Sequence, residues 1–424
     1  MIKTLRSLPA LTLAALATTG TVSAIDAGGI AIHGSLSATG AYSDQYDYYG
    51  ETADHFDMIA QELTLNGTYR FENGLRAAAQ VYAYDLAGYS DLTLDFATLD
   101  YSFSEYIGLR AGRNKLPQGM YGEVQDLDQI RTFASLPLNF YPRGLRSLST
   151  GYNGLGLYGS AALGKAGSLE YQVFGGWMSN IDGESPFAKG LASITVAEGA
   201  DLDKVYGGAL TWNTPLEGLK FVYTHNYLPG LVLNSRVQTR AGLVETGYST
   251  QAADQIDFFY GAGTWDYSGL FAGTSGSSEV DVTVKVFAVE YTRDKWVAAA
   301  EYKLTQNEGV TSLPALGVNR SPVESEEQSW YAQVTYQATD KLGVGVYYAQ
   351  SDFDPDNKDP LDDKYTSVDD LALGASYALT DNWLFKIEAH AMDGLAKLDI
   401  VGDRNLGATD PKWNYFVVKT TFSF

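Results

Sequence analysis

The stretch YFVVKTTFSF, residues 415–424, is the clearest strand of the chain and the starting point for its fold. Phe416, Val418 and Phe422 alternate with polar residues such as Lys419 and Thr421. A period of two places successive side chains on opposite faces of a β-strand. One apolar and one polar face suit a wall between lipid and water, but they also suit a soluble β-sandwich. The rest of the chain has to separate these two architectures.

The same alternation recurs in sixteen segments, and an even number of strands is typical of single-chain bacterial barrels. The pattern at Val282, Val284 and Val286 changes parity at Phe287, which indicates a bulge or a misplaced strand. Apolar stretches within residues 228–280 leave room for one more hairpin, and therefore for eighteen strands. The predicted strands cover residues 28–41, 58–71, 75–85, 93–103, 106–114, 151–160, 168–177, 204–213, 218–227, 281–292, 296–305, 328–338, 341–350, 368–379, 382–392 and 413–424.

The connections between these strands alternate between very short and long. Short ones such as residues 72–74 and 339–340 contain Asn, Asp or Gly, which favour reverse turns. Membrane barrels have short periplasmic turns and long extracellular loops, whereas a sandwich has no reason to keep this rhythm. We therefore predict an all-β, antiparallel transmembrane barrel. Its predicted long loops include residues 115–150, 178–203, 228–280, 306–327, 351–367 and 393–412.

Residues 1–24 have the pattern of a secretory signal peptide. Lys3 and Arg6 precede an apolar run from Leu8 to Ala17, and small residues follow up to Ala24. This run is far shorter than the roughly 20 residues that a membrane-spanning helix needs. We expect cleavage after Ala24, which leaves a barrel over residues 25–424.

The composition of the chain excludes several classes of protein. There is no cysteine, so neither disulfides nor thiol chemistry contribute. The formal charge of -22 becomes -24 once Lys3 and Arg6 are removed, and such acidity argues against nucleic-acid binding. Tyrosine is abundant at 30 residues, which fits aromatic girdles at the membrane interfaces and a wet inner wall.

In its signal peptide, sixteen-strand rhythm and terminal aromatic strand, the chain resembles the bacterial general-porin superfamily. The resemblance covers the whole mature chain. It implies a homotrimer in the outer membrane of a Gram-negative bacterium, in contact with the lipid bilayer and lipopolysaccharide. It also implies a water-filled channel for passive diffusion of small hydrophilic solutes and ions, with no cofactor. In that superfamily the outer-membrane assembly machinery reads the terminal strand, which here carries Phe416, Phe422 and Phe424.

Members of the superfamily fold their third long loop into the barrel, where it narrows the pore. The matching segment here is residues 115–150. Its apolar stretches, Phe133 to Leu138 and Phe140-Tyr141, favour packing against a wall over exposure to solvent. An ordinary surface loop is the alternative. The resemblance implies that the charged residues of this loop form a constriction, with Glu123, Asp126, Asp128, Arg131, Arg143 and Arg146 as candidates.

The resemblance also implies basic wall residues that face the acidic loop across a gap and create a transverse field. Strand parity selects the candidates. A basic residue that faces lipid in mid-membrane costs about 2–4 kcal/mol, so the register that hides these side chains is favoured. For each one, a structural salt bridge or an interfacial anchor is the alternative. The basic candidates for the pore wall are Arg70, Arg76, Arg110, Lys386 and Lys419, and Glu388 lies on the same face as Lys386.

Other functional classes have weaker support. The histidines His33, His55, His225 and His390 are scattered without the spacing of metal ligands, so we expect no enzyme and no metal site. A barrel hydrolase would need a Ser or Asp beside one of them, and an adhesin would use the barrel only as an anchor. A channel selective for phosphate or other small anions is the closest alternative, because three arginines lie in the loop. The sequence leaves the sign of ion selectivity open.

The stretch from Ser351 to Asp370 is rich in aspartate. It lacks the glycine and the distal glutamate of a calcium-binding loop. A solvated acidic loop is the favoured interpretation, and weak binding of divalent cations that bridge to lipopolysaccharide phosphates is a hypothesis.

Overall fold

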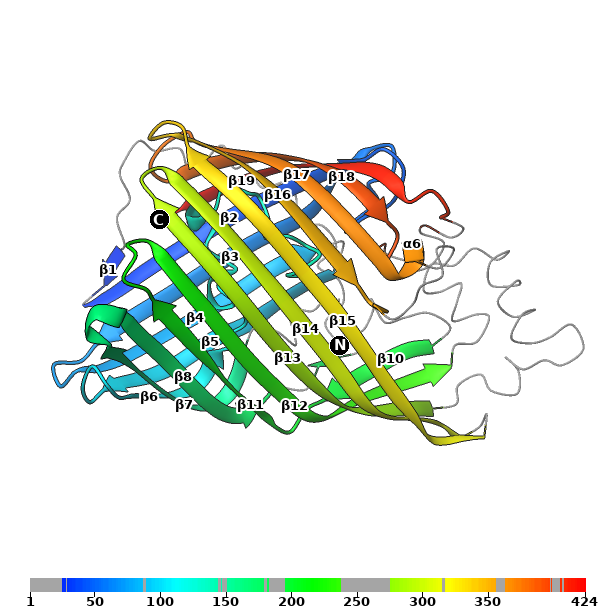
Figure 1. Cartoon of the computed structure of the whole chain (residues 1–424), viewed down its shortest axis with the longest axis horizontal. Coiled ribbons are helices and arrows are strands. Elements are labelled where there is room, and N and C mark those ends of the chain that lie inside the picture. Colours follow the sequence, from blue (N-terminus) through cyan, green and yellow to red (C-terminus); the bar gives the residue numbers. More distant parts are fainter. Residues whose placement is uncertain are drawn as a thin grey trace, which may run out of the picture.

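The computed structural model describes residues 25–27, 29–86, 89–143, 146, 151–178, 181–182, 195–237, 275–314, 317–355, 363–396, 398, 405 and 408–424. Within this part of the chain, sixteen strands pair in antiparallel succession. The last strand pairs with both its predecessor and the first barrel strand, so the sheet closes into a barrel. Figure 1 shows the tilted strands of this wall. Closure removes the free edges that an open sheet would present.

The barrel strands follow the chain and skip two short strands. They are β2 (Ile30–Ser43), β3 (Phe56–Arg70), β4 (Leu75–Leu86), β5 (Tyr89–Ser102), β6 (Gly108–Lys115), β7 (Gly151–Ala162), β8 (Ser168–Trp177), β11 (Val205–Asn213), β12 (Leu219–Val237), β13 (Ser275–Arg293), β14 (Trp296–Leu313), β15 (Val318–Gln337), β16 (Leu342–Asp352), β17 (Ser367–Ala378), β18 (Trp383–Gly394) and β19 (Lys412–Ser423).

Short elements decorate this frame. The strand β1 (Ile25–Ala27) pairs with β2, and β10 (Thr195–Asp201) pairs with β12 and with β9 (Ile181–Asp182). Among the described residues, no helix is long and apolar enough to cross a membrane. The helical elements are η2 (Gly122–Val124), η3 (Asp128–Ile130), η5 (Gly164–Ala166) and α6 (Asp363–Thr366).

All sixteen predicted strands are present, and the barrel closes with sixteen, so the prediction of the fold is confirmed. Two predicted loops are wrong in extent. Residues 306–327 belong mostly to β14, which ends at Leu313, and to β15, which begins at Val318. The predicted connection 228–280 begins later, because β12 continues to Val237, and ends earlier, because β13 starts at Ser275. Most of the suggested extra hairpin falls in residues 238–274, outside the described residues.

The parity change in β13 is not a bulge. The pairing of β13 with β14 runs without interruption from Ser277 to Arg293. Val280 and Val286 are buried inside the barrel, whereas Phe287 is 53 % exposed on the outside. The inner face is apolar in this half of the strand because an apolar loop packs against it. The register shift in this region lies in β12, between Leu228 and Leu231.

Exposed apolar side chains form the outer surface of the wall. Leu92, Leu373 and Leu155 are among the most exposed, at 70, 61 and 58 %. In β19, Phe416 and Val418 are exposed, whereas the alternate residues Val417 and Lys419 are buried. An apolar outer face with a polar inner face is the pattern of a barrel that spans lipid.

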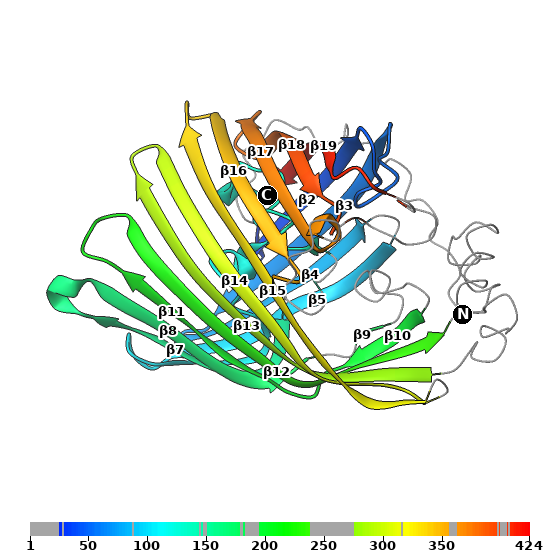
Figure 2. The same cartoon turned by 45° about the vertical axis from the view of Figure 1, so that its right-hand side comes forward.

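The wall is tallest on one side. The strands β12 to β15 have 18 to 20 residues each, whereas β6 has 8. A tilted strand of about 9–11 residues is enough to cross a membrane. Figure 2 shows these long strands, green to yellow, curving beyond the end of their neighbours on the side of the long loops.

Candidate functional site

The connection between β6 and β7, described over residues 116–143 and at residue 146, crosses the inside of the barrel. Gly119 donates its N–H to Thr224 Oγ1 of β12 at 3.1 Å, and Ala134 donates its N–H to Glu388 of β18. Arg146 pairs with Asp95 of β5 at 3.1 Å. These three strands stand far apart around the barrel, so one loop can contact all of them only from within. We call this segment the inner loop.

The wall holds the backbone of the inner loop with charged side chains. The ammonium of Lys386 donates to the carbonyls of Asp128 and Phe133, at 2.7 and 2.8 Å. Glu388 accepts from the N–H of Ala134 and from that of Ser135. Lys386 and Glu388 are only 1 and 4 % exposed. They were expected to line the pore, but the inner loop covers them, and they anchor its backbone instead.

A second anchor lies on β14 and β15. Glu301 accepts the N–H of Met120 at 2.8 Å, the hydroxyl of Tyr141 at 2.7 Å and the hydroxyl of Tyr331. Lys303 donates to the carbonyl of Phe140 at 2.6 Å. Glu301 and Lys303 are 2 and 3 % exposed. A buried charge is tolerated only when it is paired or fully hydrogen-bonded, and here the partners come from the inner loop.

Aromatic packing completes these anchors. Phe133 packs against Tyr347 of β16 with ring centroids 4.9 Å apart, and Phe140 packs against Tyr331 of β15 at 5.2 Å. These rings belong to one buried cluster that also contains Val286. The apolar stretches of the inner loop therefore supply a core inside the barrel.

Asp128 of the inner loop meets the basic wall directly. Lys419 Nζ lies 2.9 Å from its carboxylate, Thr421 donates to it at 2.7 Å, and Arg131 also pairs with it. Burial alone would raise the pKa of Asp128, but the charges of Lys419 and Arg131 lower this pKa to about 2. The expected open gap between acidic loop and basic wall is therefore wrong for this pair, whose charges are in contact.

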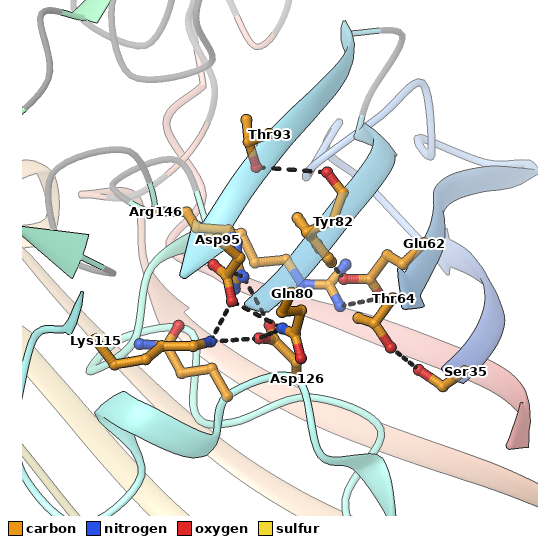
Figure 3. A network of polar contacts seen from close by, with 12 residues as sticks. Ser35, Glu62, Thr64, Gln80, Tyr82, Thr93, Asp95, Lys115, Asp126 and Arg146 are labelled. Carbon is orange, nitrogen blue, oxygen red and sulfur yellow. Dashed lines mark hydrogen bonds and ion pairs between the residues drawn. The ribbon is translucent and has the colours of Figure 1, made fainter. Parts of the chain in front are cut away.

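Asp126 is the centre of a second network, drawn in Figure 3. Its carboxylate pairs with Lys115 at 2.6 Å and with Arg146 at 2.7 Å, and it accepts a hydrogen bond from Gln80. Burial opposes ionisation, but Arg146 and Lys115 outweigh it and hold the pKa of Asp126 below its ordinary value. Asp95 of β5 also forms ion pairs with Lys115 and Arg146.

A third network lies nearer the short turns. Arg110 pairs with Asp100 at 2.9 Å and approaches Glu123 of the inner loop to 3.8 Å. Arg76 reaches the same Asp100 at 3.5 Å. Arg70, which pairs with Arg76 across the hairpin in the sheet register, is exposed. Of the wall candidates, Arg110 thus comes closest to the geometry expected from the sequence.

The terminal phenylalanines belong to β19, whose pairing with β2 closes the barrel. We call this junction the seam. Phe416 is 45 % exposed on the outer face of β19. Phe424 exchanges two backbone hydrogen bonds of 2.9 Å with Gly34 of β2, next to the pairing of Phe422 with Leu36. A Cβ atom on Gly34 would collide with the Phe424 ring, so a larger residue there would displace the ring.

The main residues missed from the sequence are Glu62, Asp95, Lys115, Glu301 and Lys303. Strand parity assigns Glu62, Glu301 and Lys303 to the inner face, so a search for every inward charge would have found these three. Asp95 is harder to find, because the register of β4 and β5 shifts beside it. That bulge turns Asp95 inward toward Lys115.

No group of three or more His, Cys, Asp or Glu side chains that could hold a metal ion occurs in the described part of the chain. Most of the aspartate-rich stretch 351–370 is described, but residues 356–362, at its centre, are not.

The fold and the inner loop together define a porin-type β-barrel. No family model and no curated protein match the chain. Solved structures do: OmpT of Vibrio cholerae has a TM-score of 0.54 at 12 % identity, over 95 % of this chain and 100 % of its own. An anion-selective porin from Comamonas acidovorans has a TM-score of 0.54 at 11 % identity, over 93 and 99 % of the two chains. Salmonella typhi OmpF, in complex with daunomycin, has a TM-score of 0.52 at 14 % identity, over 93 and 97 %. At these identities the likeness shows a shared barrel fold.

Proposed function

We propose that this protein is an outer-membrane porin, a water-filled channel through which small hydrophilic solutes and ions diffuse passively. One observation carries the proposal: the inner loop is anchored inside a closed barrel by wall residues on several sides. Such a loop narrows the lumen of the barrel. The outer-membrane proteins and porins among its structural neighbours support the same function at a coarse level.

Solutes pass between the inner loop and the wall formed by β2, β3 and β4. A pocket lies there, lined by Ser35 and Ser37 of β2, Glu62 and Thr64 of β3, and residues of the inner loop. Size selection comes from the loop backbone, which the wall anchors fix in place. Charge selection comes from the ion-paired side chains at the same level.

The channel works without catalysis. Both ring nitrogens of His390 contact carboxylates, Nδ1 with Asp370 at 3.0 Å and Nε2 with Glu388 at 3.1 Å. A general base needs one nitrogen directed at the group that it deprotonates. His33 and His55 are exposed, and His225 pairs across strands with Lys285. These positions support a structural role for the histidines.

The proposal includes export and assembly. Residues 1–24, outside the described residues, act as a cleaved signal peptide, and the assembly machinery recognises the strand with Phe416, Phe422 and Phe424. The mature chain forms a homotrimer in contact with lipid and lipopolysaccharide. A trimer form of Vibrio cholerae OmpT, with a TM-score of 0.53 at 12 % identity, supports this state.

Planar-bilayer recording of the purified mature protein tests the channel. We expect large ohmic current steps in KCl that arrive in groups of three. The decisive variant deletes residues 120–141 of the inner loop, and it should conduct several-fold more current than the wild type. Circular dichroism and heat-modifiability on gels show whether this variant has folded. A folded wild-type protein without any current would overturn the proposal.

An anion-selective channel is the second candidate, and one observation favours it. Arg143 and Arg146 are each 18 % exposed, whereas Asp126 and Asp128 are 6 and 5 % exposed beneath their basic partners. Glu62 keeps 19 % of its side chain exposed at the same level, so two guanidinium groups and one carboxylate face the solutes there. The reversal potential under a KCl gradient measures the preference, and a potential of the cation-selective sign would contradict this candidate.

A further inference from the structure

His390 of β18 lies buried between two carboxylates. Its Nδ1 lies 3.0 Å from Asp370 of β17, and its Nε2 lies 3.1 Å from Glu388 of β18. The three side chains are between 0 and 3 % exposed. This inference rests on the proposed channel and concerns the residue that sets the width of its passage.

The two contacts of His390 fit a ring with a proton on both nitrogens. An ionised carboxylate only accepts hydrogen bonds, and a neutral imidazole has a single N–H to donate. A neutral ring would leave one of the two buried carboxylates against a bare nitrogen, and a buried charge without a partner is costly. An imidazolium donates in both directions and offsets part of the charge of Asp370 and Glu388.

Glu388 connects His390 to the inner loop. Oε2 of its carboxylate contacts His390, whereas Oε1 accepts the N–H of Ala134 and, at 3.4 Å, the N–H of Ser135. Ser135 and the next residue, Leu136, line the pocket between the inner loop and β2 to β4. The position of Glu388 therefore fixes the part of the inner loop that borders the passage.

The tyrosines packed around His390 do not replace its N–H donors. Tyr347 of β16 already donates its hydroxyl to Asp370, at 2.8 Å. The ring of Tyr415 in β19 lies 5.6 Å from the His390 ring, and the ring of Tyr48 lies 5.0 Å from that of Tyr415. Within the described part of the chain, neither of these two hydroxyls makes a hydrogen bond.

The basic residues of this part of the barrel have other partners. Lys386, on the same face of β18, donates to two backbone carbonyls of the inner loop. Arg143 of the inner loop pairs with Glu62 at 3.4 Å. Among the residues that the structure describes, His390 is the only base that forms an ion pair with either of the two carboxylates.

We propose that His390 is a positioning residue for the pore-narrowing part of the inner loop. As a buried imidazolium it holds Glu388 where that carboxylate fixes Ala134 and Ser135. Loss of one ring proton to solvent leaves two buried carboxylates with a single N–H between them, so Asp370 and Glu388 repel each other and the loop is held less firmly. The passage then widens, and the channel conducts more at alkaline pH.

Nitrogen NMR on protein with isotope-labelled histidine tests the charge of the ring directly. An ordinary histidine ring is neutral at pH 8. The ring of His390 should show both nitrogens protonated at that pH, and its signals should be absent from the variant His390→Gln. A neutral ring at His390, with one unprotonated nitrogen, would overturn the proposal.

Amide hydrogen exchange measures the hold on the inner loop without any current. His390→Gln keeps a hydrogen-bond donor but removes the charge, and it should accelerate exchange at residues 133–136 about tenfold. Adding Asp370→Asn removes one of the two repelling carboxylates and should restore most of the slow exchange, which a mere loss of packing would not allow. His33→Gln, at an exposed position of β2, is the matched control and should exchange like the wild type.

Planar-bilayer recording connects the loop to the passage. The single-channel conductance of His390→Gln should lie between that of the wild type and that of the variant without residues 120–141. The wild type should rise toward this value at alkaline pH, whereas His390→Gln should lack the rise. Equal conductance and equal pH profiles of the two proteins, both folded by circular dichroism, would overturn the positioning role and leave the channel intact. Fast loop exchange in His390→Gln, in a protein that never conducts, would support the hold on the loop and overturn the channel.

Discussion

Lys419 of β19 and Asp128 of the inner loop form an ion pair of 2.9 Å, with 2 and 5 % of their side chains exposed. This pair joins the last strand of the barrel to a segment almost three hundred positions earlier in the chain. Because Lys419 also contacts Glu62 of β3, one ammonium connects the inner loop to both sides of the barrel seam.

Replacement of Lys419 should therefore destabilise the protein strongly. We expect Lys419→Met to lower the free energy of unfolding by about 3 kcal/mol, because it leaves the buried carboxylate of Asp128 and the half-buried carboxylate of Glu62 with fewer cationic partners. Urea unfolding in detergent measures the change. Lys412→Met in the same strand is the control, since Lys412 is 78 % exposed and its pair with Asp393 is 4.0 Å long, and it should change stability by less than about 0.5 kcal/mol. Equal losses in the two variants would contradict the role of the buried pair.

Stability should fall at strongly acidic pH through Asp128. Its pKa of about 2 in the folded protein lies below the ordinary value of 3.8, so its stabilising contribution is complete above that ordinary value. The contribution is lost as the pH falls through about 2, and its size is about 2 kcal/mol. Unfolding midpoints between pH 6 and pH 2 measure it. Asp128→Asn should be less stable at pH 6 and should lose less stability on acidification, and parallel pH profiles would argue against this assignment.

Glu301 should control the order of the inner loop without controlling the barrel. Glu301→Ala leaves the Met120 N–H and two tyrosine hydroxyls without their acceptor, and each such loss costs about 1–3 kcal/mol. We expect amide hydrogen exchange over residues 116–143 to accelerate by about tenfold or more. Exchange in the wall strands should stay slow. Glu308→Gln on the same strand, where the side chain is exposed, should leave the loop unchanged. Fast exchange spread over the whole barrel would show that Glu301 stabilises more than the loop.

The alternation of side chains in β19 predicts that its outer face does not tolerate a charge. Val418 is 37 % exposed on the outer face, so Val418→Arg puts a charge against lipid at a cost of about 2–4 kcal/mol. We expect this variant to insert poorly into vesicles in a refolding assay. Val418→Leu controls for side-chain volume and should insert as well as the wild type. Normal insertion of the arginine variant would mean that this part of the wall does not face lipid.

Much of the fold can be predicted from sequence because the strands obey a strict period. Alternation such as that around Lys419 persists wherever one face meets lipid and the other meets water. It fails in the upper half of β13, where Val280 and Val286 face inward. There the inner face packs against the apolar inner loop and not against water. The apolar residues of the strand therefore lie on the inner face at Val286 and on the outer face at Phe287. A local pattern cannot show which face is inside.

The lengths of the loops were harder to predict for a related reason. Residues 306–327 look polar because β14 and β15 are longer there than a membrane crossing needs, and a strand with polar residues on both faces resembles a loop. Glu308 and Glu324 are direct partners across that hairpin. Hydrogen bonds between β14 and β15, rather than burial of apolar side chains, hold this part of the hairpin together. The pattern of a single sequence does not reveal such pairing.

The charged residues of the site were identified by type, but their partners were not. Parity placed Lys386 and Lys419 on the inner face, which is correct. Whether such a base lines water or supports a loop depends on contacts more than two hundred residues away in sequence, such as that from Lys386 to Phe133. No local signal encodes those contacts.

The pairing of β19 with β2, where Phe424 meets Gly34, also determines when the chain is protected from aggregation. Until β19 docks, the sheet has two unpaired margins, along β2 and along β18, and each offers its N–H and C=O groups to any passing strand. Fifteen finished strands give no partial protection, because a nearly complete ring is still an open sheet. The final 12-residue strand therefore removes both unpaired edges at once and turns an aggregation-prone open sheet into a closed barrel.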